Sequence, residues 1–181
     1  LNQTDQAITA YQKAIELDPK YASPWNGLGN VYRALKQYED TRSAFEKAIE
    51  LEPKFSSPWN DLGITFTQQK EYEKALPAYQ KAIELAPEND SYRRSLIGIL
   101  RRLGREAEAQ AQIETARKLM DKETEYPRAC FESICGNRDE ALRLLQIALE
   151  NKEVNIGWAR QDPDFDNIRD DPRFKELVGL E

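Results

Sequence analysis

Apolar residues recur every three or four positions along much of the chain, which is the spacing of residues on one face of an α-helix. The two clearest stripes are Trp25, Leu28 and Tyr32, and then Trp59, Leu62 and Phe66. This pattern predicts helices that each bury a single apolar stripe.

The stripes belong to copies of one unit with a period of 34 residues. YASPWNGLGNVY begins at Tyr21 and FSSPWNDLGITF begins at Phe55. The segments KAIELDPK, KAIELEPK and KAIELAPE keep the same period and end near Pro19, Pro53 and Pro87. Small and large residues also recur at this spacing: Ala14, Ala48, Ala82 and Ala116; Ala7, Thr41, Ala75 and Ala109; Tyr11, Phe45, Tyr79 and Ile113. The fixed spacing predicts a repeat protein in which each unit buries its apolar face against the next.

Each unit is predicted to be a helical hairpin. Ser23-Pro24 and Ser57-Pro58 are typical of an N-cap followed by proline at the first helical position. Polar residues near 36–37 and 70–71 leave room for a short turn, and a second helix then ends before the next proline. The small residues would let the paired helices approach closely while an aromatic side chain fills the space beside them.

These features together resemble the tetratricopeptide repeat, with its W-x-x-L-G-x-x-Y first helix, its Ala/aromatic/Ala second helix and its terminal proline. The resemblance is strong over residues 7–87. It implies an all-α, right-handed superhelical solenoid of antiparallel hairpins. It also implies a concave groove, lined by the first helices, that binds an extended peptide or a partner protein.

We expect a repeat array over residues 1–151 and a C-terminal cap over residues 152–181. The array would comprise the second helix of a truncated repeat (1–19), three repeats (22–53, 56–87 and 90–121) and a degenerate repeat (122–151). Its third unit has Arg93 at the position of the tryptophan, and Asn89 is expected to cap the first helix of that unit. Because the chain opens in mid-repeat, we interpret it as a piece of a longer polypeptide.

The predicted cap contains two similar segments, DPDF from Asp162 and DPRF from Asp171. Each is typical of an Asp N-cap, a proline at the first helical position and a short helix. The tail resembles the ends of many bacterial tetratricopeptide proteins. We expect five apolar side chains to cover the last repeat: Trp158, Phe165, Ile168, Phe174 and Leu177.

Composition narrows the partners. The net charge of −6 argues against binding to nucleic acid or to an anionic membrane. No apolar run reaches the length of about 20 residues that a membrane span needs. Cys130 and Cys135 are five residues apart in a predicted helix, so their thiols diverge and are expected to be reduced and partly buried. A cytoplasmic location fits reduced thiols.

The sequence offers little for catalysis. It contains no histidine, so the commonest general base and zinc ligand are absent from the 181 residues. We therefore expect no enzyme activity, no metal and no cofactor. Asp162, Asp164 and Asp166 have the spacing of calcium ligands in an EF-hand, but the required glycine and final glutamate are replaced. Helix capping explains these residues better.

The candidate binding residues lie on the first helices, beside the apolar stripe. They are Asn26, Asn30 and Arg33 in the first unit, Asn60, Thr67 and Gln68 in the second, and Arg94, Arg101 and Arg102 in the third. Asparagine can both donate to and accept from a peptide backbone. Between Ser91 and Leu103 there are four arginines and no acidic residue. This run indicates either an anion-selective part of the groove or a solvated helix face.

The main functional prediction is a non-enzymatic interaction module that holds a peptide or partner domain in its groove. The alternative is an accessory or regulatory domain of an enzyme whose catalytic part lies outside this sequence. Self-association through the open N-terminal repeat end is a further prediction. The partner is expected to be a protein or peptide, with acidic character favoured.

Overall fold

The computed structural model describes residues 3–120 and 123–180, and every regular element in these ranges is helical. The chain divides into two compact units, residues 1–112 and residues 113–181. The expected all-α repeat fold is confirmed, whereas the right-handed superhelical course stays a prediction. None of the described helices is long and apolar enough to cross a membrane.

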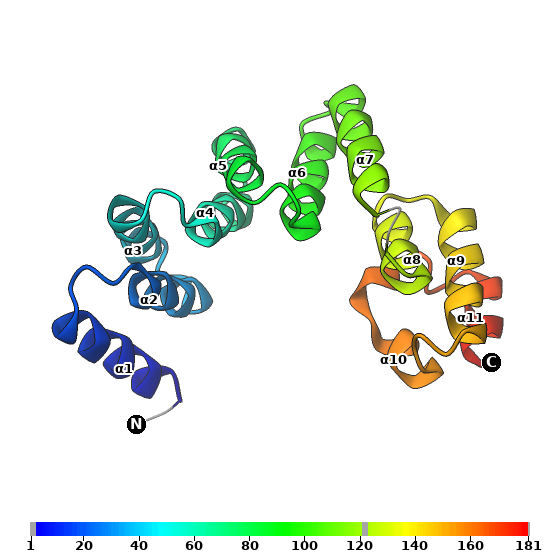
Figure 1. The fold of residues 1–181 in the computed structure, drawn as a ribbon, viewed down its shortest axis with the longest axis horizontal. Coiled ribbons are helices and arrows are strands. Elements are labelled where there is room, and N and C mark those ends of the chain that lie inside the picture. The colour runs from blue at the N-terminus through cyan, green and yellow to red at the C-terminus, as the bar shows by residue number, and fades with distance from the viewer. Residues whose placement is uncertain (1–2, 121–122, 181) are drawn as a thin grey trace. The chain divides into compact units, whose positions relative to one another are not determined.

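The first unit is a series of helices joined by short connections. In order they are α1 (Gln3–Leu17), α2 (Ala22–Ala34), α3 (Tyr38–Leu51), α4 (Ser56–Gln68), α5 (Tyr72–Leu85) and α6 (Asp90–Arg102). Each helix packs against the next, and α2–α3 and α4–α5 form the closest pairs (Figure 1). The first helices also contact one another, α2 with α4 and α4 with α6. Helix α7 (Glu106–Met120) crosses the division between the units.

The hairpin turns share one backbone geometry. Lys36, Lys70, Gly104 and Gly136 all have φ between 60° and 79°. The residue after each one donates its N–H to the carbonyl of the residue five positions earlier in the chain, for example Glu71 to Phe66 at 2.8 Å. This is the left-handed helix ending that satisfies otherwise unpaired carbonyl groups. The turns predicted at 36–37 and 70–71 are confirmed, although lysine rather than glycine adopts the left-handed conformation there.

Aromatic rings of the second helices fill slots left by glycines of the first helices. A Cβ placed on Gly29 would lie 2.5 Å from the Phe45 ring, and one on Gly63 would lie 2.7 Å from the Tyr79 ring. Ala48 and Ala82 are fully buried beside these rings. The predicted use of small residues for close helix approach is therefore confirmed.

The predicted serine caps are wrong. Helices α2 and α4 begin before Ser23 and Ser57, at Ala22 and Ser56, and their N-cap residues make no side-chain capping hydrogen bond. Proline instead occupies the third helical position, where its missing N–H costs nothing because the first turn has no intrahelical acceptor. The Asn89 cap is confirmed, since its side chain accepts a hydrogen bond from the Ser91 N–H at 3.1 Å.

The second unit packs the end of α7 with four further helices and a short 3-10 turn. These elements are α8 (Glu125–Ile134), α9 (Arg138–Glu150), α10 (Ile156–Gln161), η1 (Pro163–Phe165) and α11 (Pro172–Val178). The boundary predicted between residues 121 and 122 lies outside the described residues, and the proposed division of the array stays a prediction.

The C-terminal segment packs on the α8–α9 hairpin with most of the expected side chains. Phe165, Ile168 and Phe174 are fully buried in one cluster with residues of both helices, and Leu177 packs against it. The prediction for Trp158 is wrong, because this side chain is 63% exposed. Helix α10 turns the neighbouring Ala159 inward instead, and one residue along a helix rotates a side chain by about 100°.

The glycine slots can be tested with a matched pair of substitutions. Gly63→Ala places a methyl group against the Tyr79 ring, whereas Gly98→Ala meets no atom within 4 Å. We expect Gly63→Ala to lower the free energy of unfolding by about 1–3 kcal/mol through overpacking. Gly98→Ala should raise it by about 0.5–1 kcal/mol, because alanine is the better helix former. Urea unfolding followed by circular dichroism measures both, and equal gains would show that the slot is not tight.

Candidate functional site

Predicted groove residues of the first repeat meet around a carboxylate of the second repeat that the sequence analysis missed. Asp61 of α4 accepts a hydrogen bond from the Asn30 amide of α2 at 3.1 Å. Arg33 donates to the Asn30 carbonyl oxygen at 2.6 Å, and its guanidinium lies 3.9 Å from Asp61. The three side chains link neighbouring first helices, so part of the predicted binding face is held in a fixed geometry.

Asp61 is an electrostatically unusual member of this network. Burial raises the pKa of Asp61 above its ordinary value, while the Asn30 hydrogen bond, the Arg33 charge and the Asn26 amide act in the opposite direction. Asp61 occupies the position that Gly27 holds one repeat earlier. The sequence did hold a signal for Asp61. It adjoins Asn60 on the candidate face, and an acid in place of the glycine 34 residues earlier departs from the repeat pattern.

Asn26 and Asn60 occupy the same repeat position on α2 and α4. The side-chain oxygen of each is enclosed and has no hydrogen-bond partner among the described residues. Thr67 is engaged instead, since its hydroxyl donates to the Gly63 carbonyl at 2.8 Å and lies 3.1 Å from the Tyr79 hydroxyl. Gln68 is exposed.

The four arginines of the third repeat have different surroundings. Arg93 is buried and donates to the Gln112 side chain and the Pro87 carbonyl, each at 3.0 Å, so it is structural. Burial lowers the pKa of Arg93. The other three have local partners: Arg94 lies 3.4 Å from Asp90, Arg101 lies 3.6 Å from Glu106, and Arg102 lies over the Tyr72 ring.

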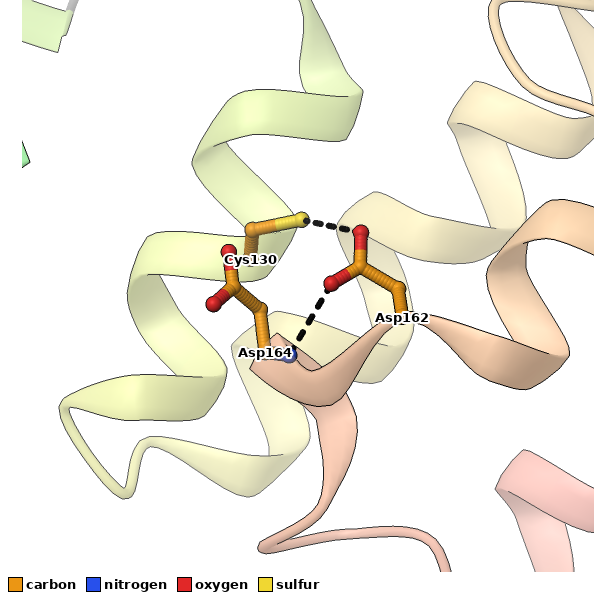
Figure 2. Close-up of side chains that lie close together, drawn as sticks. All are labelled: Cys130, Asp162 and Asp164. Atoms are coloured by element: carbon orange, nitrogen blue, oxygen red, sulfur yellow. Dashed lines mark hydrogen bonds between the residues drawn. The ribbon is translucent and has the colours of Figure 1, made fainter. Parts of the chain in front are cut away.

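A group of potential metal ligands in the unit of residues 113–181 is explained by helix capping. Cys130 Sγ, Asp162 and Asp164 have ligand atoms within 4.8 Å of one another (Figure 2). Asp162 accepts from the Asp164 N–H at 2.9 Å, from the Tyr126 hydroxyl at 2.6 Å and from Cys130 Sγ at 3.8 Å. Its oxygens are therefore already occupied by protein donors. Burial, together with the neighbouring Asp162, raises the pKa of Tyr126.

The double-cap interpretation of the tail is confirmed. Asp162 caps η1, and Asp171 caps α11 by accepting from the Arg173 N–H at 2.9 Å. The third candidate calcium ligand, Asp166, accepts a hydrogen bond from Arg169 at 2.7 Å and does not join Asp162 and Asp164 in the ligand group. Cys130 and Cys135 form no disulfide and are buried, more deeply than expected.

An ion pair that the sequence analysis also missed links α7 to the degenerate hairpin, and its carboxylate is buried. Arg117 of α7 donates to both oxygens of Glu132 at 2.6 and 2.7 Å, and Asn137 donates to the same carboxylate at 3.0 Å. Glu132 is only 5% exposed. Arg117 follows Ala116 as Ile49 follows Ala48, and Glu132 precedes its turn residue by four positions as Phe66 does. Ile49 and Phe66 pack on one apolar cluster. An apolar contact between helices has thus become a charged one.

Comparison with known families agrees with this geometry. A model described as "TPR repeat" matches residues 1–35, and the tetratricopeptide repeat model matches residues 22–55 and 57–89. The chain therefore carries tetratricopeptide repeats over residues 1–89. A curated relative, Tetratricopeptide repeat protein 37 of Xenopus laevis, is 49% identical over 37 residues. That match covers 20% of this chain and 2% of the relative.

Solved structures extend the likeness beyond those repeats. A MamA structure superimposes with a TM-score of 0.61 at 23% identity, covering 69% of this chain and 68% of that one. MamA from Desulfovibrio magneticus RS-1 gives 0.59 at 24% identity, covering 68% and 70%. YrrB, described as a TPR protein with an unusual peptide-binding site, gives 0.56 at 27% identity, covering 84% and 79%.

The raised pKa of Asp61 predicts a pH-dependent effect of Asp61→Asn. The folded protein holds this proton more tightly than the unfolded chain, so ionisation of Asp61 costs folding free energy. The cost is absent below the ordinary pKa of 3.8 and grows as pH rises through the folded pKa. Asp61→Asn should therefore gain stability relative to the native protein between acidic and neutral pH. Urea unfolding of both proteins at acidic and at neutral pH measures this. A stability difference between them that does not change with pH would contradict it.

The Arg117–Glu132 ion pair gives a second test. Arg117→Leu leaves the buried Glu132 carboxylate with only the Asn137 amide, and we expect a loss of about 1–3 kcal/mol. The double variant Arg117→Leu/Glu132→Met should return to within about 1 kcal/mol of the native protein, because an apolar pair can replace a buried ion pair. Chemical unfolding of the native protein and both variants measures this. A double variant that is less stable than Arg117→Leu would contradict it.

Proposed function

We propose that the protein is a non-enzymatic interaction module that binds an extended segment of a partner protein along its first-helix face. This face comprises the predicted residues of α2, α4 and α6: Asn26, Asn30, Arg33, Asn60, Thr67, Gln68, Arg94, Arg101 and Arg102. The observation that carries the proposal is the Asn30–Arg33–Asp61 network, because it positions polar groups of two successive repeats on neighbouring helices before any partner arrives.

Asparagine chemistry supports a peptide backbone as the bound group. Asn26 and Asn60 carry side-chain oxygens that lack a hydrogen-bond partner among the described residues, one on each of two successive first helices. A backbone N–H of an extended segment would satisfy such an oxygen after a small rotation of the side chain. The described peptide-binding site of YrrB, at 27% identity, supports the same class of ligand.

The proposed partner segment is acidic where it meets α6. Arg94 and Arg101 are seven residues apart and therefore share one side of the helix. Asp90 and Glu106, which lie 3.4 and 3.6 Å from these arginines, have side chains that are 44% and 66% exposed. Exposed ion pairs contribute little to stability, so a carboxylate of the partner can compete with them. We place the protein in the cytoplasm and expect neither nucleic acid nor membrane among its partners.

A charge-reversal pair tests this proposal. A partner captured with the full chain is titrated against Arg94→Glu/Arg101→Glu and against the control Lys13→Glu/Lys47→Glu. Both control lysines lie on second helices, where they pair with Glu16 and Glu50. We expect the arginine reversal to weaken binding about tenfold or more at low salt and less at high salt, because ions screen the attraction.

The outcomes separate the alternatives. Equal losses from both double variants, or no loss from the arginine pair, would overturn the acidic partner. Binding that also survives Asn30→Ala and Asn60→Ala would overturn the first-helix face as the site. The accessory-domain alternative stays a prediction, as does self-association through α1, whose described residues are all at least partly exposed. Sedimentation of the full chain over a range of concentrations tests the self-association.

A further inference from the structure

A polar cavity of about 170 Å³ lies among α7, α8 and α9 in the unit of residues 113–181. Its polar lining consists of Arg117, Arg128, Glu132, Asn137 and Glu140, and its apolar lining consists of Met120, Phe131 and Leu144. One water occupies about 30 Å³ of liquid, so the cavity has room for about five waters or for a short organic group.

The two acidic residues of the cavity are already neutralised. Glu132 accepts two hydrogen bonds from Arg117 and one from Asn137. Glu140 accepts two from Arg143, each at 2.7 Å, and Arg143 does not line the cavity. Arg117 and Arg143 therefore hold the two carboxylates by hydrogen bonds. The Arg143 hydrogen bond lowers the pKa of Glu140, and the more distant charges of Arg128 and Arg117 act in the same direction.

Arg128 is the guanidinium of the lining that hydrogen-bonds neither carboxylate. Its side chain is partly buried, and within residues 3–120 and 123–180 it has neither a hydrogen-bond acceptor nor a carboxylate within 4 Å. Arg128 precedes the turn residue Gly136 by eight positions, as Leu62 precedes the turn residue Lys70 in the second repeat. Leu62 is a core residue. A guanidinium has thus replaced an apolar side chain, and its charge acts on Glu140 without a hydrogen bond between them. Its N–H groups are not enclosed, so they can donate to a bound anion.

We propose that this cavity binds a carboxylate carried on a short aliphatic chain, with Arg128 as its principal ligand. The guanidinium groups of Arg117, Arg128 and Arg143 exceed the carboxylates of Glu132 and Glu140 by one charge, which suits a monoanion. The fork of a guanidinium also matches the two oxygens of a carboxylate. Met120, Phe131 and Leu144 provide apolar contacts for methylene groups. A phosphate dianion would bring a second charge close to Glu132 and Glu140, and an ammonium ion would be repelled by Arg117 and Arg128.

The test uses small probes of one size and different charge. Full-length protein labelled with ¹⁵N is titrated with butyrate, butyramide, butylammonium and inorganic phosphate, and amide chemical shifts are recorded. Butyrate should give saturable shifts in α7, α8 and α9, while butyramide, of the same shape without the charge, should bind about tenfold or more weakly. Butylammonium and phosphate should give no saturable shifts there.

Arg128→Gln should weaken butyrate binding about tenfold or more, because it removes the charge and the fork. Arg138→Gln is the matched control: Arg138 lies in the same unit and pairs with Asp171 at 3.7 Å, outside the cavity lining. Its butyrate affinity should stay unchanged. If Arg128→Gln does not fold, Arg128→Lys keeps the charge but not the fork and should bind butyrate with an intermediate affinity.

Several results would overturn the proposal. These are equal binding of butyrate and butyramide, tighter binding of phosphate than of butyrate, or unchanged butyrate affinity in whichever Arg128 variant folds. The absence of any saturable shift would overturn it too. None of these results bears on the first-helix face, because the cavity is lined entirely by residues 117–144.

Discussion

The fit of an aromatic ring from a second helix into a glycine slot of a first helix is the contact on which the repeat hairpins depend. Phe45 and Tyr79 are almost completely enclosed, and their rings lie where a Cβ on Gly29 or Gly63 would have to be. This close approach fixes the separation of the paired helices and therefore the direction in which the rest of each first helix faces. Interior glycine costs about 0.5–1 kcal/mol in helix propensity, so the packing gain must exceed that amount.

The polar face follows from the same constraint. Because α2 and α4 each pack closely on their own partner helix, they also lie against each other, and Asn30 and Arg33 can reach Asp61. The degenerate hairpin shows what happens when the apolar pattern is relaxed. Apolar positions around it have become charged, as the Arg117–Glu132 pair with α7 and as Arg128 in place of a core leucine.

The sequence predicted those features that repeat, because a period of 34 residues carries the same local interactions into each unit. The hairpins, their turns and the small-residue slots were found in this way. Helix starts were placed wrongly, since proline is tolerated throughout a first turn and not only at its first position. Trp158 was misplaced because a helix of six residues gives too short a pattern to define its buried side. Asp61 and Arg128 were missed because each departs from the repeat, and only the fold shows what surrounds them.

The central claim, that ring and slot are one interaction, is tested most directly by a double-mutant cycle between Gly63→Ala and Tyr79→Ala. Chemical unfolding of the native protein, both single variants and the double variant gives the coupling free energy. If the ring occupies the space that the new methyl group needs, removal of the ring also removes the overpacking. The double variant should then be at least about 1 kcal/mol more stable than the sum of the single effects predicts. Single effects that add to within about 0.5 kcal/mol would contradict the account.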